Sequence, residues 1–261
     1  MNKELEDRYL SVIEDNINVG KSSAVKEFFI LAAGIVGVCF AVYFCAGLLA
    51  NFWIDRMSVE TQVKIEQFFA REYKQSDKPK HEKIVYLESV KPKIIEMDKN
   101  LQNRSEFPIY EDKSDEINAF IAPDGTIHFT SAILKELDDK ESLTFVLAHE
   151  LAHYSHRDYL RTIGRELIAG SVLFVLSMGQ ADITNLIKGA SAISGVQYSQ
   201  SQERAADLYA NAVLMKLYGR NDGAVKFFEM LNKKENVPEF LYYFSSHPPT
   251  SERIRYLKNA R

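Results

Sequence analysis

Three histidines lie within eight positions of the chain, in the segment AHELAHYSHRD at residues 148–158. His149 and His153 are four residues apart, so on a helix both imidazoles share one face and can reach the same metal ion. Glu150 follows His149 and can take a proton from a water molecule that the metal activates. The HExxH pattern therefore predicts a helix that carries two zinc ligands and a general base.

A zinc site of this kind needs a third protein ligand. His156 shares the face of His149 but lies about 10 Å further along the helix axis, too far for one ion to bind both easily. On a second predicted helix, at 201–214, Glu203 and Asp207 are four residues apart, and interspersed alanines allow close packing. We therefore expect Glu203 to complete the metal site, and Asp207 to accept a hydrogen bond from a ligand histidine and fix its tautomer.

The elements that must position these residues are mostly helical. Alternating apolar residues at 116–130, with turn residues at 123–125, predict a β-hairpin. His128 alternates with its apolar neighbours and is expected on the strand surface, not as a ligand. Gly219 is well placed to end a helix. Helical periodicity is found in the segments 131–137, 142–157, 203–218 and 223–233.

Residues 28–50 form an apolar run of 23 residues without a charge. A helix of this length spans roughly 35 Å, which exceeds the ~30 Å hydrocarbon core of a bilayer. We predict a tail at 1–27, one uncleaved transmembrane anchor at 28–54 and a catalytic domain at 55–261. The flanking basic residues are too evenly distributed to predict which side of the membrane carries the domain.

A second apolar run, at 167–179, has 13 residues, too few to span a bilayer. It lies in an apolar insert at 163–196, which we expect to form a re-entrant or surface-lying hairpin, or a buried helix. The net charge is −4, and no basic tract with interleaved aromatic residues indicates a nucleic-acid partner. The two cysteines both fall in the first apolar run, which argues against a disulfide framework or a cysteine metal site.

Four segments resemble, in the same order, the HtpX-type family of zinc metallopeptidases, which also holds the CAAX prenyl endoproteases and the Oma-type proteases. They are NAFIAPDGTIHFTSAIL, LAHELAHYSHRD, SQERAADLYA and SHPPTSERI. The resemblance covers about residues 60–260. It implies an α+β, mainly helical, zincin-like gluzincin domain with a small sheet and one Zn²⁺ per chain. By the match, His149, His153 and Glu203 bind the zinc, Glu150 is the catalytic base and Asp207 is the aspartate of the second helix.

Zincins hold extended substrates against an edge strand beside the active-site helix, through main-chain hydrogen bonds. Residues 118–122, with Asn118, Ala119 and Phe120 as the contacts, or residues 126–130 are the candidates for this edge. The resemblance places His247 at the cleft. Three roles remain open for it: packing, donation of a hydrogen bond to the oxyanion, or a latch in the position of the water.

These patterns predict a single-pass, membrane-anchored zinc endopeptidase that acts on proteins or peptides, with a role in membrane or envelope protein quality control. The main alternative is a non-catalytic membrane chaperone or adaptor stabilised by zinc. A structural zinc prefers four protein ligands and gives no reason for Glu150. A metal-dependent hydrolase of a non-peptide substrate is a second alternative.

Overall fold

A computed structural model describes residues 3–14, 24–69, 81–103, 106–177 and 197–233, together with residues 247, 253 and 255–257. The chain divides into two units, Met1–Cys45 and Ala46–Arg261. Helix α1 (Lys3–Glu14) lies in the first unit, and helix α2 (Ala24–Asp55) begins there and continues into the second.

Helix α2 covers the predicted anchor at 28–54 and extends beyond it at both ends. Its large apolar side chains are exposed; Phe28, Val36 and Leu48, for example, are 65%, 68% and 56% accessible. By length and composition, α2 is able to cross a membrane.

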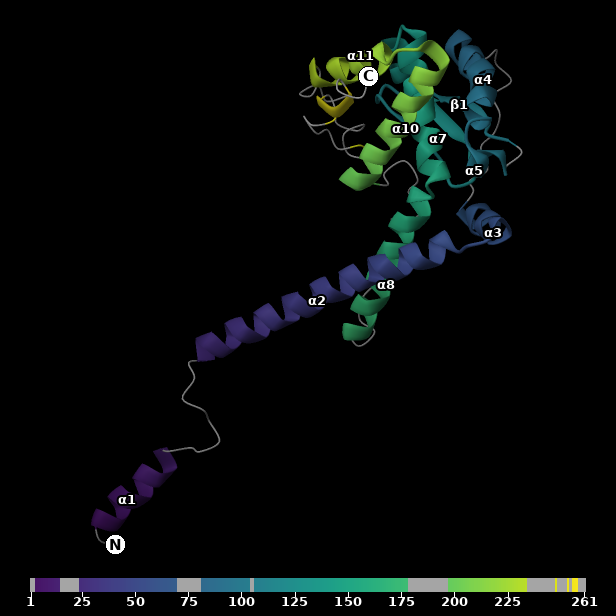
Figure 1. The fold of residues 1–261 in the computed structure, drawn as a ribbon. Helices are drawn as coiled ribbons and strands as arrows, with labels where there is room; N and C mark the ends of the chain where they lie inside the picture. The colour runs from purple at the N-terminus through teal and green to yellow at the C-terminus, as the bar shows by residue number, and fades with distance from the viewer. Residues whose placement is uncertain are drawn as a thin grey trace. The chain divides into compact units, whose positions relative to one another are not determined.

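The second unit is mostly helical with a small sheet, as the sequence predicted (Figure 1). Helices α7 and α10 lie side by side, and α4, α11 and strand β2 also pack against α7. The helices are α3 (Val59–Phe69), α4 (Glu82–Ile95), α5 (Lys99–Gln102), α6 (Ser131–Glu136), α7 (Lys140–Ser155), α8 (Asp158–Leu176), α10 (Gln200–Tyr218) and α11 (Asp222–Lys233). The strands are β1 (Ile109–Asp112), β2 (Ala119–Ile121) and β3 (Ile127–Thr130).

The predicted hairpin is present as β2 and β3, which pair antiparallel around a turn in which Gly125 has a φ of 79°. The sequence did not indicate β1, whose short segment IYED shows no apolar alternation. Strand β1 pairs in parallel with β3, so the strand order is β1-β3-β2. The prediction that residues 126–130 form a free edge is therefore wrong, because β3 is paired on both sides.

The expected surface position of His128 is also wrong, since its side chain is completely buried. The strand on either side supplies an aromatic ring: the His128 ring stacks on Phe120 at 4.7 Å and on Tyr110 at 5.6 Å. Its Nδ1 lies 3.0 Å from a carboxylate oxygen of Asp112. Alternation correctly placed His128 on the other face from its apolar neighbours, but side chains of the flanking strands cover that face.

Helix α7, which carries HExxH, is buried on nearly all sides. Asp139 caps its first turn by accepting a hydrogen bond from the Ser142 backbone N–H at 2.9 Å. A turn at His156 and Arg157 separates α7 from α8; Arg157 is a non-glycine residue with a φ of 57°, and its guanidinium donates to the Ile54 carbonyl at the end of α2. The hydrogen bond ties this left-handed residue to α2.

The second apolar run begins within α8. This helix has 19 residues and starts at Asp158, nine positions before the run. Ile163 of α8 packs on Ala50 and Ile54 of α2, whereas Leu167 and Phe174 are 39% and 38% exposed. The described part of the run is therefore not a buried core helix. The rest of the 163–196 insert, beyond residue 177, lies outside the described residues.

Candidate active site

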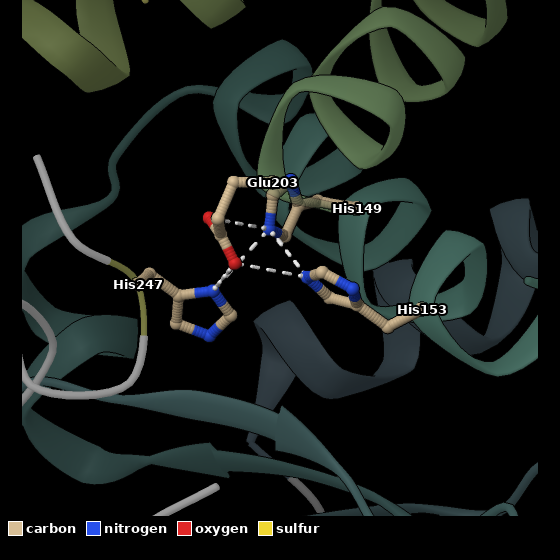
Figure 2. Close-up of side chains that lie close together, drawn as sticks. All are labelled: His149, His153, Glu203 and His247. Atoms are coloured by element: carbon tan, nitrogen blue, oxygen red, sulfur yellow. Dashed lines mark hydrogen bonds and ion pairs between the residues drawn. The ribbon is translucent and has the colours of Figure 1, made fainter. Parts of the chain in front are cut away.

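Two helices, the buried α7 and the partly exposed α10, bring the predicted metal ligands together (Figure 2). His149 and His153 project from α7, and Glu203 projects from the first turn of α10. Close approach of the two helices is possible because the residues at their contact are small: Ala148, Ala152, Ala206 and Ala210 have at most a trace of exposed surface. His247 reaches the same point from a segment near the C-terminus, and all four side chains are buried.

The ligand atoms of these four side chains fit one zinc ion. Zinc bonds of about 2.0–2.1 Å place tetrahedral ligand atoms roughly 3.3 Å apart. His149 Nε2 lies 3.1 Å from His153 Nε2 and 3.4 Å from His247 Nδ1. Glu203 Oε1 lies 3.3 Å from His153 Nε2 and 2.9 Å from His247 Nδ1. The nitrogens and the carboxylate are also ligand types that zinc prefers.

Glu150 lies beside this cluster and is 1% exposed. Its Oε1 atom has no hydrogen-bond partner among the described residues, and it is 3.6 Å from His247 Nε2. A buried carboxylate oxygen without a partner is costly, so its retention needs a reason. A free proton-accepting oxygen next to a metal site is what a general base requires.

A carboxylate lies close to the outer ring nitrogen of each of the two histidines of α7. Asp158 Oδ2 lies 2.8 Å from His153 Nδ1. Asp207 Oδ1 lies 3.1 Å from His149 Nδ1, although the two groups are poorly aligned for a hydrogen bond. Such partners fix which ring nitrogen is available to the metal. Asp207 thus lies at ion-pair distance from His149 without an aligned hydrogen bond, whereas Asp158 makes such a hydrogen bond with His153.

Sequence reasoning missed Asp158, Arg253 and Tyr198. Arg253 pairs with Glu203 at 2.8 Å and with Asp207 at 2.7 Å, and so joins the two carboxylates of α10. The Tyr198 ring stacks on His153 with centroids 3.9 Å apart. Asp158 follows the motif directly, which is a local signal. Arg253 is 46 residues from Asp207, and no pattern in the sequence relates the two.

The electrostatics of the cluster favour a bound cation. Burial on its own would raise the pKa of Glu203, but the charge of His247 and a hydrogen bond with His153 hold it well below its usual range. Burial lowers the pKa of His149. Burial acts the same way on His153, but the hydrogen bonds with Asp158 and Glu203 prevail and raise its pKa to about 10. A metal ion would displace that proton, because only neutral histidine binds metal.

The remaining predicted residues lie around this cluster. His156 is outside it: its side chain is 33% exposed, and its Nδ1 is 4.0 Å from Asp158. Asn118 directly precedes strand β2, and Ala119 and Phe120 belong to that strand, which packs against α7. Of the segment SHPPTSERI, only His247 and Arg253 belong to the described residues.

Comparison with known proteins gives relatives that are peptidases by name. The chain is 22% identical over 223 residues to the Beta-barrel assembly-enhancing protease of Yersinia pestis, covering 78% of this chain and 44% of that one. It is 26% identical over 219 residues to a Protease HtpX homolog of Thermodesulfovibrio yellowstonii, covering 66% and 76%. With the Mitochondrial metalloendopeptidase OMA1 of Saccharomyces cerevisiae, the identity is 24% over 193 residues, covering 67% and 55%.

The chain spans only 44% and 34% of the length of two of the assembly-enhancing proteases it matches. Residues 86–261, which include HExxH, Glu203 and His247, match Peptidase family M48. With the converged ligand set, this match over most of the chain shows that the protein belongs to peptidase family M48.

Proposed function

We propose that the protein is a zinc-dependent endopeptidase. The observation that carries this proposal is the convergence of His149, His153 and Glu203 beside a buried carboxylate, Glu150, one oxygen of which makes no hydrogen bond. Membership of a peptidase family supports it, as do the names of the relatives. A zinc ion held by His149, His153 and Glu203 would supply Lewis acidity and lower the pKa of a water molecule.

The residues of this chain perform the other steps. Glu150 accepts the proton of the attacking water and later delivers it to the leaving amine, as a general base and then a general acid. Asp158 and Asp207 keep the histidine rings oriented through their outer nitrogens. Arg253 neutralises the second carboxylate charge on α10, so that Glu203 and Asp207 do not repel each other.

Strand β2 is the proposed substrate edge. The residues on either side of β2 form backbone hydrogen bonds toward β3. The Thr130 N–H donates to the Asn118 carbonyl at 3.0 Å, and the Ala122 N–H donates to the Thr126 carbonyl at 2.7 Å. Because main-chain groups alternate in direction along an antiparallel strand, those of Ala119 and Ile121 point away from β3. These two residues, rather than Asn118 and Phe120, would therefore bond an extended peptide.

His247 is proposed to hold the enzyme latent. Its Nδ1 lies 2.9 Å from Glu203 Oε1 and 3.4 Å from His149 Nε2. These distances suit a fourth metal ligand, which supports a latch over a role in packing alone. A fourth protein ligand closes a zinc site to water. His247→Ala should raise basal proteolysis and self-cleavage; lower turnover, by about 10²-fold, would instead assign His247 as a donor to the oxyanion.

Helix α2 is the proposed membrane anchor, with the tail at 1–27 and the peptidase domain at 55–261 on its two sides. The exposed apolar side chains of the helix support this arrangement, and so does the single tryptophan at position 53, since interfacial tryptophans are favoured. The names of the assembly-enhancing relatives support a role in protein quality control at a membrane or envelope.

The test is proteolysis of casein by the purified full chain, with and without a chelator, followed by addition of zinc. Wild type should lose activity with the chelator and regain it with zinc. Glu150→Gln should keep its zinc but lose about 10²–10⁴-fold in rate, because an amide cannot accept the proton. Comparable turnover by a zinc-loaded Glu150→Gln protein would end the peptidase proposal and leave the zinc-stabilised chaperone or adaptor.

A further inference from the structure

A polar cavity lies between helices α2, α8 and α10, apart from the metal cluster. Its volume is about 590 Å³, within the range of roughly 300–1,000 Å³ that is usual for small-molecule sites. Three arginines line it, at positions 157, 161 and 165, and the carboxylates in its wall are Asp55 and Asp158. All of its lining residues belong to the second unit.

Two of the three arginines are already engaged. Arg157 donates to the carbonyl of Ile54, at the end of α2, and to that of Met57, just beyond it. Arg161 pairs with Asp55 at 2.6 Å and donates to the Asn51 side chain at 3.1 Å.

Arg165 differs from its two neighbours. Within the described part of the chain, it forms no hydrogen bond or ion pair. The two carboxylates that line the cavity do not pair with Arg165, because Asp55 pairs with Arg161 and Asp158 is bonded to His153 and Gln202. Glu166, the next residue of α8, interacts with Arg165 through its charge alone and does not line the cavity. The cavity therefore has a positive charge to offer an anion.

The position of Arg165 along α2 and α8 indicates which kind of anion the cavity would bind. Gly164 of α8 packs closely on Ala50 of α2, and the Arg165 guanidinium stem passes beside Gly47, inside the apolar run of α2. Beyond Glu166, the next ten residues of α8 carry no charge, and Leu167 is exposed. Where α2 and α8 contact each other, both helices thus pass from a polar to an apolar surface. Such a transition is expected at the boundary between lipid and water.

We propose that this cavity binds the phosphate of a membrane-lipid headgroup, with Arg165 as its main contact. The proposal rests on the anchoring of α2 proposed above. A guanidinium beside an apolar run needs a counter-ion, because an isolated charge at a membrane edge is costly. Phosphate matches the fork of N–H donors on arginine, and basic pockets between helices at the membrane surface suit anionic headgroups. Ser199 and Ser201 add hydroxyl donors to the wall.

The test compares lipids that remain bound to the full chain. The protein is purified in a neutral detergent and mixed with equal amounts of phosphatidylglycerol, which is anionic, and phosphatidylcholine, whose choline neutralises the phosphate. Native mass spectrometry then counts the bound lipids. Wild type should retain phosphatidylglycerol in preference, and Arg165→Gln should reduce this retention at least about 10-fold, as expected for loss of a charged hydrogen-bonded pair. Arg165→Lys should lie between the two.

Arg56→Gln is the matched control. Arg56 is exposed at the same end of α2 and stacks on Phe52, but does not line the cavity. An equal loss in Arg56→Gln and Arg165→Gln, or no preference for phosphatidylglycerol in wild type, would overturn the proposal. Circular dichroism must show that each variant is folded.

A second arm separates a lipid from a soluble phosphate compound. Calorimetric titration of the lipid-free protein with inorganic phosphate should give only weak binding. Strong binding that depends on Arg165, without lipid preference, would overturn the headgroup assignment in favour of a soluble phosphate. Flotation of wild type with phosphatidylcholine vesicles tests the anchoring itself, and casein proteolysis tests the peptidase, so the three proposals can fail separately.

Discussion

Charged side chains lie between closely packed helices at two places in the second unit, and they are neutralised in different ways. Between α7 and α10, the carboxylates of Glu203 and Asp207 share Arg253, and all three side chains are at most 3% exposed. Between α2 and α8, Arg161 has Asp55 as a partner, but Arg165 faces an open cavity. A closed site must balance its own charges, whereas an open one can leave a charge for a ligand.

The closed site should depend most strongly on Glu203. Glu203→Ala removes a carboxylate from the ligand set, and we expect the purified protein to lose its zinc. His156→Ala is the matched control: it should retain zinc, because His156 lies outside the cluster. Metal analysis of folded protein measures both. Loss of zinc from folded His156→Ala would show that the ligand assignment is wrong.

The next largest effect is expected from Arg253. In Arg253→Met, two buried carboxylates lose their shared partner, and the free energy of unfolding should fall by about 3–5 kcal/mol. Arg204→Met is the control, since Arg204 lies on α10 next to Glu203 but is exposed, and it should change stability by less than about 0.5 kcal/mol. Denaturant titration compares them. A similarly small loss of unfolding free energy in both variants would mean that the two carboxylates of the closed site do not need Arg253 as a counter-ion.

A smaller effect is expected from the carboxylates behind the histidines. Asp207→Asn and Asp158→Asn should each weaken zinc binding about 10–100-fold, because each loosens one ligand ring. Competition with a chelator of known affinity gives the two dissociation constants. Unchanged zinc affinity in both variants would mean that the ring orientation is set by packing, for instance by the Tyr198 ring, and not by the carboxylates.

The last prediction compares two glycines at helix contacts, Gly223 of α11 and Gly164 of α8, by the stability change that an added methyl group should cause. A Cβ atom at Gly223 of α11 would lie 2.4 Å from the Glu141 side chain and 2.5 Å from its backbone, so Gly223→Ala should cost about 1–3 kcal/mol. At Gly164, the nearest atom would be 3.4 Å away, and Gly164→Ala should be neutral or stabilising by up to ~1 kcal/mol. Thermal unfolding measures both variants. A larger drop in Tm for Gly164→Ala than for Gly223→Ala would contradict this prediction.

Much of the helical framework was predictable because its signals are local. The periodicity of 203–218 and the glycine at 219 indicated α10 and its end, and Gly219 indeed adopts a φ of 69°. The structure also shows where local signals fail. Pro92 lies inside α4, a position where proline usually breaks a helix, yet α4 continues to Ile95. Strand β1 carries no apolar alternation, and only its pairing with β3 makes it a strand.

The sequence by itself determined that His149 and His153 share a face and that residues 28–50 can form a helix long enough to span a bilayer. Both follow from the fixed rise and turn of a helix. The tertiary structure alone decided that Arg253 joins Glu203 to Asp207, that β3 is central and that Arg165 faces a cavity. These facts depend on which surfaces pack together across long stretches of chain, and packing is set by the shape and charge of both partners, which no single segment contains.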